Sequence, residues 1–318
     1  MSRKASVLAH LMNSHAPLSG QVIADELQIT RSAVWKAIET LRKDGYLIEG
    51  VPNQGYRLTT NDTQINPQTL KELLPSYEIE VLDQVDSTNS EMKRRSPKSK
   101  SILVSHTQKS GRGRLGRSFF SPRGGLYFTV ALPLDMAIDS ALLITSAAAV
   151  ATSEGLATIA HVEPSIKWVN DLFVGNKKIS GILTEGIISM ERRVMATVIV
   201  GIGINLHLDV TLLPAELQEI VGSLFDPSKP LPIDPHLLIA DIITRFERLV
   251  LALPDSAFLE IYRRRSNLIG KEVRVYEGEH SYIAKVEGID EQAHLLITDG
   301  EGITRSLSSG EVSIRLEG

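Results

Sequence analysis

Apolar residues recur with helical spacing in some stretches of the chain and alternate in others, which divides the sequence into three segments. In residues 1–62 the spacing predicts three short helices, and Ser19 and Thr30 are placed to cap the second and third. Two short strands, Tyr46–Glu49 and Tyr56–Leu58, follow around a Pro-Asn-Gln-Gly turn. Two helices joined by a tight turn and followed by a hairpin predict a winged helix-turn-helix.

Residues 63–268 contain both stretches with helical spacing of apolar residues and stretches in which apolar and polar residues alternate. Strands are predicted at 79–85, 102–106, 125–132, 165–169, 178–187 and 193–204. Long helical patterns run over 139–159, 234–253 and 255–268. Several strands follow each other through short turns, so this segment favours a mixed or antiparallel sheet with helices over strict βαβ winding.

In residues 269–318 apolar and polar residues alternate over short stretches. Five strands are predicted at 272–277, 282–287, 294–298, 303–307 and 312–316, with glycines between them. Five short strands in so few residues predict a small β-barrel of SH3-like size. The chain is therefore an α+β multidomain protein with expected domains 1–62, 63–268 and 269–318.

Composition narrows the class of protein. The chain has 318 residues and no cysteine, which excludes a disulfide framework and thiolate chemistry. The N-terminus has no long apolar signal region, and no run of about 18 apolar residues occurs. We therefore expect a cytoplasmic protein that makes no use of a membrane.

The third predicted helix carries its polar residues away from the apolar stripe formed by Val34, Ile38 and Leu41. These polar and aromatic positions are the DNA-contact candidates Arg31, Ser32, Trp35, Lys36 and Arg42. A recognition helix would present such side chains to base edges and phosphates. The alternative is an interaction module that does not use DNA, because residues 1–58 hold only seven Lys and Arg against five Asp and Glu. Trp35 could also belong to the core.

Ten Lys and Arg and no acidic residue lie between Glu91 and Asp135, and residues 111–116 read Gly-Arg-Gly-Arg-Leu-Gly. A strand precedes this G-x-G-x-x-G pattern, but Ser-Pro-Arg-Gly-Gly at 121–125 cannot open a helix, so a dinucleotide fold is excluded. No Gly-Lys-Ser/Thr follows, which excludes a P-loop. The pattern predicts a loop that binds an anion through backbone amides and guanidinium groups. A flexible basic surface loop is the alternative.

Four further motifs accompany the loop in a fixed order. They are Asp-Ser-Thr-Asn at 86–89, Lys-Trp-Val-Asn-Asp-Leu at 167–172, Lys-Ile-Ser-Gly-Ile-Leu-Thr-Glu at 178–185 and Gly-Ile-Gly-Ile-Asn at 201–205. The set resembles the catalytic domain of biotin–protein ligases. With the predicted winged helix and C-terminal barrel, nearly the whole chain is similar to bifunctional ligases of the BirA type, which also act as biotin operon repressors. Leu115, Phe119 and Val169 depart from the residues usual in that family.

The resemblance implies a class II synthetase-like fold and a two-step reaction. Biotin and ATP, with Mg²⁺, give biotinyl-5′-AMP, and the biotinyl group then passes to a lysine of the biotin carboxyl carrier protein of acetyl-CoA carboxylase. It implies that Lys167, Arg114 and Arg112 are the catalytic residues, and that the protein itself supplies no metal site. Biotin-operator DNA is the second expected partner, with a homodimer when biotinyl-AMP is bound.

The same resemblance assigns the ligand-contact residues. Biotin is expected to contact Ser87, Thr88, Asn89, Gln108, Arg112, Gly113, Arg114, Lys167, Gly181, Gly201 and Gly203. The nucleotide is expected to contact Arg114, Lys167, Lys178, Asn205 and Arg315, and residues 206–220 to form a loop over the adenine. Three alternatives stay open: a ligand-sensing repressor without catalysis, a lipoate ligase, and a ligase whose winged helix does not regulate.

Overall fold

The structure of this chain is a computed structural model. It describes residues 3–12, 14, 16–43, 48–52, 54–58, 63–277, 280–308 and 311–314.

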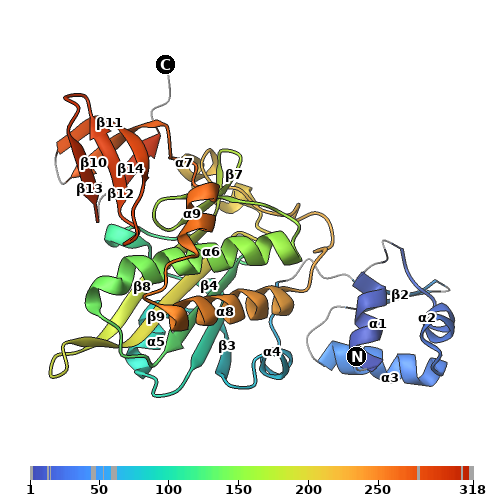
Figure 1. The fold of residues 1–318 in the computed structure, drawn as a ribbon. Coiled ribbons are helices and arrows are strands. Elements are labelled where there is room, and N and C mark those ends of the chain that lie inside the picture. Colours follow the sequence, from blue (N-terminus) through green and yellow to red (C-terminus); the bar gives the residue numbers. More distant parts are fainter. Residues whose placement is uncertain are drawn as a thin grey trace.

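The N-terminal segment is a helix-turn-helix followed by a hairpin (Figure 1). Its elements are α1 (Arg3–Met12), α2 (Gly20–Leu27), α3 (Arg31–Lys43), β1 (Ile48–Val51) and β2 (Gly55–Leu58). Ser19 caps α2 by accepting a hydrogen bond from the Val22 amide, and Thr30 accepts from Ala33 in front of α3. The first predicted strand begins at Ile48 rather than Tyr46, and Tyr46 itself lies outside the described residues.

A seven-stranded mixed sheet forms the centre of the molecule, as predicted. Its order is β3-β4-β5-β9-β8-β7-β6, and only β3 and β4 are parallel neighbours. The strands are β3 (Glu78–Val85), β4 (Ser101–Gln108), β5 (Leu126–Leu132), β6 (Ser165–Lys167), β7 (Asp171–Val174), β8 (Lys177–Ser189) and β9 (Val194–Ile204).

Two long helices, α6 (Ala141–Ile159) and α8 (Pro235–Ala252), cover one face of this sheet (Figure 1). The alanine-rich α6 is long and apolar enough to cross a membrane, but most of it is buried inside the fold, as expected of a core helix. The short helix α5 (Thr88–Arg95) packs on the opposite face, where Met92 meets Leu103 and Ile199. The periodicity missed α4 (Pro67–Leu73) and β7, and α9 (Leu259–Arg265) is shorter than predicted.

The C-terminal segment is an antiparallel sheet of order β13-β12-β11-β10-β14. The strands are β10 (Glu272–Glu277), β11 (His280–Ile289), β12 (Leu295–Asp299), β13 (Thr304–Leu307) and β14 (Glu311–Ile314). The five strands match the prediction, but the barrel is not confirmed. In the described residues the edge strands β13 and β14 each pair with one neighbour only, so no pairing closes the sheet.

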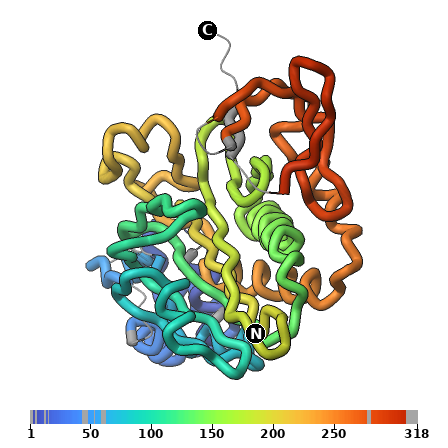
Figure 2. The backbone as a smooth tube through the Cα atoms, turned by 90° about the vertical axis from the view of Figure 1, so that its left-hand side faces the viewer, coloured from blue at the N-terminus to red at the C-terminus, as the bar shows by residue number. Residues whose placement is uncertain are grey.

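This C-terminal sheet lies at the opposite end of the molecule from the N-terminal segment (Figures 1 and 2). Its buried residues, such as Val273 and Ile297, belong to the same continuous apolar cluster as the central sheet and α6. The N-terminal helices have a separate cluster around Ile23, Val34 and Ile38. The described chain thus has two large cores, one at the N-terminus and one shared by the remaining elements.

Candidate functional site

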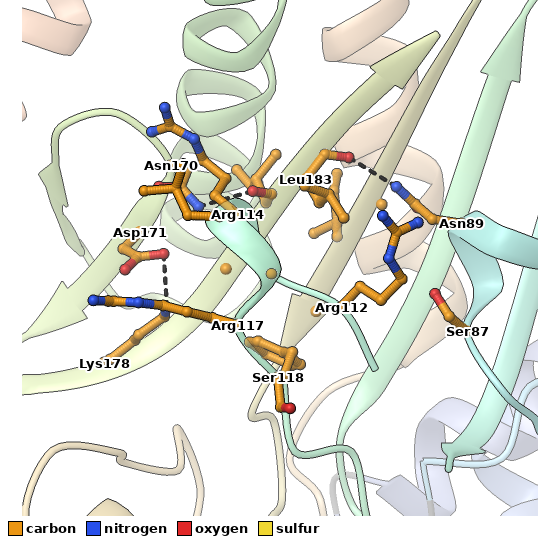
Figure 3. Close-up of a pocket in the computed structure, with 18 of the residues that line it drawn as sticks. Ser87, Asn89, Arg112, Arg114, Arg117, Ser118, Asn170, Asp171, Lys178 and Leu183 are labelled. Atoms are coloured by element: carbon orange, nitrogen blue, oxygen red, sulfur yellow. Dashed lines mark hydrogen bonds and ion pairs between the residues drawn. The ribbon is translucent and has the colours of Figure 1, made fainter. Parts of the chain in front are cut away.

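A cavity of about 140 Å³ opens on the face of the central sheet that carries α5. Its walls come from six places in the sequence: the start of α5, the end of β4, the loop 111–119, the end of β6 with the residues after it, β8, and β9 (Figure 3). Twelve of the predicted ligand-contact residues line it: Ser87, Thr88, Asn89, Gln108, Arg112, Gly113, Arg114, Lys167, Lys178, Gly181, Gly201 and Gly203. The structure therefore brings together residues up to 116 positions apart in the sequence, from Ser87 to Gly203.

The start of α5 forms one wall and is built from buried, mutually hydrogen-bonded side chains. Ser87 is the N-cap, and the hydroxyl of Thr129 on β5 hydrogen-bonds with both Thr88 Oγ1 and Asn89 Oδ1. Asn89 Nδ2 donates to the Leu183 carbonyl and to Glu185. Because its amide is used on both sides, Asn89 fixes α5 on the sheet and turns the helix N-terminus, with its positive dipole end, toward the cavity.

Gln108 and the glycine–arginine loop form the second wall. Gln108 Oε1 accepts from the Thr88 amide at 2.8 Å, and its Nε2 donates to Ser121 at 2.8 Å. The loop side chains diverge from this base. Figure 3 shows Arg112 on the side of Asn89 and Leu183, whereas Arg114 lies beside Asn170. The two arginines thus serve opposite ends of the same cavity.

Positive charge gathers at the end reached by Arg114. Lys167 is the last residue of β6 and lines the cavity, while Ile166 is buried and does not line it, as the alternation predicted. Trp168 is also buried, but it lines the cavity beside Lys167. Lys178 makes an ion pair of 2.7 Å with Asp171. Burial lowers the pKa of Arg114 despite the nearby Asp171, which indicates a guanidinium taken out of water without full compensation. Such an end is suited to a multiply charged anion.

Glycines form the floor on β8 and β9. The ring of Phe119 lies on them, so that an added Cβ at Gly203 would be 2.4 Å from the ring and one at Gly181 would be 2.9 Å away. An added Cβ at Gly201 would lie 2.1 Å from Asn89 Oδ1. The absence of side chains at these three positions makes room for the apolar and amide groups that line the cavity.

Some predicted contacts are not at the cavity. Asn205 is 3% exposed, donates to the Lys178 carbonyl at 3.3 Å and does not line the cavity. Residues 206–220 form a short 3-10 turn (Val210–Leu212) and α7 (Ala215–Gln218) that lie against the start of β8. Arg315 lies outside the described residues.

The structure adds cavity residues to which the sequence reasoning gave no role. Among them are Arg117, Phe119, Asn170, Asp171 and, behind the wall, Glu185. Asp171 lies in the motif at 167–172 and Glu185 in the motif at 178–185, so these motifs were the signal that the sequence offered. Their function as partners of cations depends on strand pairing, which the sequence alone does not give.

On the N-terminal segment, α3 presents Arg31, Ser32, Trp35 and Lys36 to solvent. Trp35 is 52% exposed, so the core alternative for this residue is wrong. Arg42 differs from the others because its guanidinium donates to the Ile48 carbonyl at 2.7 and 2.9 Å and pairs with Glu39. Arg42 therefore holds the hairpin against α3.

Comparisons with known proteins match both parts of the chain. Residues 81–205 match the Biotin/lipoate A/B protein ligase family, and residues 3–57 match an HTH domain. The Bifunctional ligase/repressor BirA of Bacillus subtilis (strain 168) is 32% identical over 303 residues, which cover 92% of each chain. The Biotin–[acetyl-CoA-carboxylase] ligase of Mycobacterium tuberculosis is 28% identical over 74% of this chain and 88% of its own.

A solved structure agrees with these relatives. The biotin protein ligase from Aquifex aeolicus in complex with biotin and ATP is similar with a TM-score of 0.62 and 30% identity, over 76% of this chain and 99% of that one. The cavity, the helix-turn-helix and these matches together show that the chain belongs to the Biotin/lipoate A/B protein ligase family, alongside the bifunctional ligase/repressor proteins.

Proposed function

We propose that this protein is a cytoplasmic biotin–protein ligase that also acts as a transcriptional repressor. As an enzyme it joins biotin to ATP, releases pyrophosphate, and passes the biotinyl group from biotinyl-5′-AMP to a lysine of the biotin carboxyl carrier protein of acetyl-CoA carboxylase. The observation that carries the proposal is the cavity itself, in which Arg112, Arg114 and Lys167 surround a glycine floor. The relatives named as a bifunctional ligase/repressor and as a biotin–[acetyl-CoA-carboxylase] ligase support it.

The chemistry needs no nucleophile from the protein. A biotin carboxylate oxygen attacks the α-phosphorus of ATP, and the bond to pyrophosphate breaks. The acceptor amine then attacks the carbonyl of the mixed anhydride, loses a proton and displaces AMP. Lys167 and Arg114 hold the negative oxygens in place and stabilise the charge that develops, and Arg112 holds the biotinyl group in position, which is catalysis by position and electrostatics.

The biotin end of the cavity is the wall made by α5 and β4. Ser87, Thr88, Asn89 and Gln108 offer hydroxyl, amide and helix N-terminal groups to the polar ureido ring. The backbones of Gly113, Gly181, Gly201 and Gly203 approach the apolar bicycle and chain. An apolar ligand with a few polar atoms is recognised in this way.

The nucleotide belongs at the cationic end, with Arg114, Lys167 and Lys178. Arg315, which lies outside the described residues, is a further expected nucleotide contact. Residues 206–220 and Asn205 lie behind Lys178 and reach the adenine if the segment moves on binding.

A magnesium ion fits this end as part of the substrate. The described residues hold no group of three or more His, Cys, Asp or Glu side chains that could bind a metal alone. Asp171 and Asn170 supply oxygens inside the cavity. Mg²⁺ is commonly bound by one or two such oxygens plus substrate phosphates and water, and it neutralises part of the polyphosphate charge.

The second function is repression. The exposed face of α3, with Arg31, Ser32, Trp35 and Lys36, fits the major groove of the biotin operator, and Arg42 supports the hairpin beside it. Bound biotinyl-AMP favours a homodimer through an edge of the central sheet, so that two such helices meet a palindromic site. The boundaries 1–62, 63–268 and 269–318 are the domains we propose, with a class II synthetase-like ligase fold in the second and an SH3-like barrel in the third.

The activity is tested by ATP–pyrophosphate exchange. We expect exchange that depends on biotin and MgATP, and little with lipoate or octanoate. Exchange with lipoate and none with biotin would support the lipoate-ligase alternative, and no exchange with either would support a sensor without catalysis. Sedimentation with and without biotin and MgATP tests the dimer, which should appear only with both.

A further inference from the structure

Glu185, on β8, joins α5 to the glycine–arginine loop through a single carboxylate. It accepts hydrogen bonds from Lys93 Nζ at 2.9 Å, from Asn89 Nδ2 at 3.1 Å, and from Arg112 Nη1 at 3.2 Å to each oxygen. Only 14% of its side chain is exposed. Its cationic partners, together with the Asn89 amide, offset the cost of burying the charge, so the carboxylate stays ionised.

Arg112 uses one edge of its guanidinium for this contact. Its Nη1 also donates to Ser90 Oγ at 3.4 Å. Within the described part of the chain, its Nε and Nη2 have no hydrogen-bond partner, and Arg112 lines the cavity. Nε and Nη2 lie on the same side of the guanidinium and can donate two hydrogen bonds to an oxygen atom of a ligand.

The loop gives this contact its importance. Gly111 and Gly113 flank Arg112, so the backbone on both sides has more conformational freedom than at other residues. The carboxylate sits on a strand whose register with β9 is fixed by continuous pairing across Glu185 and Ile199. Glu185 on this rigid strand thus fixes the Arg112 side chain, whose backbone is flanked by two glycines. Because Arg112 is already held in place, less conformational entropy is lost when a ligand binds.

We propose that Glu185 is a positioning residue, which holds Arg112 by Nη1 so that Nε and Nη2 meet the ureido oxygen of biotin at the α5 end of the cavity. This inference rests on the proposed ligase function. Glu185 does not touch the reacting atoms. Its removal should weaken biotin binding and leave the turnover at saturating biotin nearly unchanged.

The test measures the biotin KM and kcat of adenylate formation in the full-length protein. Glu185→Gln keeps the shape of the side chain and removes its charge, so we expect the biotin KM to rise roughly tenfold, the effect of removing one charge-assisted hydrogen bond, with kcat within about twofold. Glu80→Gln is the matched control, because Glu80 pairs with Arg95 of the same helix α5 away from the cavity, and its KM should not change.

A double-mutant cycle separates this role from simple support of the fold. If Glu185 acts through Arg112, Arg112→Ala with Glu185→Gln should have the same KM as Arg112→Ala alone. Additive effects, or an unchanged KM in Glu185→Gln, would overturn the inference. If wild type forms no biotinyl adenylate, the proposed function fails instead.

A second variant keeps the test open if Glu185→Gln unfolds. Arg112→Lys keeps the charge on an exposed loop but has a single nitrogen, which cannot serve Glu185 and biotin together. Its biotin KM should match that of Arg112→Ala. A wild-type KM in Arg112→Lys would contradict the division of the guanidinium between two partners.

Discussion

At Gly201 the cavity wall depends on a missing side chain. An alanine Cβ would lie 2.1 Å from Asn89 Oδ1, and Asn89 cannot move away, because its amide is bonded to Thr129, Leu183 and Glu185. We expect Gly201→Ala to lower the free energy of unfolding by about 1–3 kcal/mol through overpacking. Gly288→Ala, where an added Cβ meets nothing within 4 Å, is the control, and chemical denaturation compares them. Equal stability of the two variants would argue against a fixed Asn89.

Glu185 gives the same wall a pH dependence. Burial raises the pKa of Glu185, but the hydrogen bonds from Lys93 and Asn89 and the charge of Arg112 lower it by more. The net pKa is therefore below the usual 4.5. A carboxylate with a lowered folded-state pKa stabilises the fold above its unfolded pKa and loses that contribution as the pH falls through the folded value. The stability difference between wild type and Glu185→Gln should therefore be constant from about pH 8 to about pH 6 and shrink below about pH 4.5. A difference that persists unchanged to about pH 3 would contradict this.

At the scale of elements, the hydrophobic pattern predicted most of what positions the site. The alternation of Ile166 and Lys167 already placed the lysine on the face opposite the buried isoleucine, and the Asp-Ser-Thr-Asn motif marked the start of α5. The pattern missed β7, because a four-residue strand has too few alternations to stand out. It also did not predict that the Asn205 amide donates to the Lys178 carbonyl, because that contact depends on how distant segments pack.

The recognition helix shows the same limit. Arg31, Lys36 and Arg42 all lie off the apolar stripe of α3, yet Arg42 is bonded to the hairpin while Arg31 and Lys36 are exposed. The sequence cannot tell which of these basic side chains bonds to the hairpin, because that depends on where the hairpin packs against α3, which is a tertiary contact. The closure of the C-terminal strands is also tertiary, and the alternation predicted the five strands without fixing how the edges meet.

For α3 we predict that Arg31→Ala with Lys36→Ala weakens binding to the biotin operator. Removing one phosphate contact should reduce the slope of log K against log salt by about 0.9, so the pair should reduce it by about 2. Fluorescence anisotropy over a salt series measures the slope, and adenylate formation by the same variant is the control, because the cavity is elsewhere in the fold. An unchanged slope with unchanged affinity would show that Arg31 and Lys36 do not contact the DNA.

At the scale of the molecule, the two apolar clusters predict two unfolding units. Ile38 belongs to the N-terminal cluster, whereas Leu156 of α6 and Ile297 of the C-terminal sheet belong to the other, and all three are fully buried. The Trp168 indole also donates to the Ala293 carbonyl at 2.9 Å, which ties the strand end beside Lys167 to the C-terminal sheet.

We therefore expect two transitions in calorimetry. Ile38→Ala should shift one of them, and Leu156→Ala and Ile297→Ala should both shift the other, each by about 2–5 kcal/mol of reduced stability. If Ile297→Ala moves a third transition alone, the C-terminal sheet is a separate unit, and its link to the active-site strand is weaker than the shared core implies.

The central claim is that Lys167 and the loop arginines surround a biotin–nucleotide anhydride. The most direct measurement mixes the protein with biotin, MgATP and a biotin carrier domain, and follows the mass of the carrier. We predict that wild type adds one biotinyl group, and that Lys167→Ala does so roughly 10²–10³-fold more slowly, while Lys98→Ala, at an exposed lysine outside the cavity, behaves as wild type. An unmodified carrier with wild type, or full activity in a folded Lys167→Ala, would contradict the account.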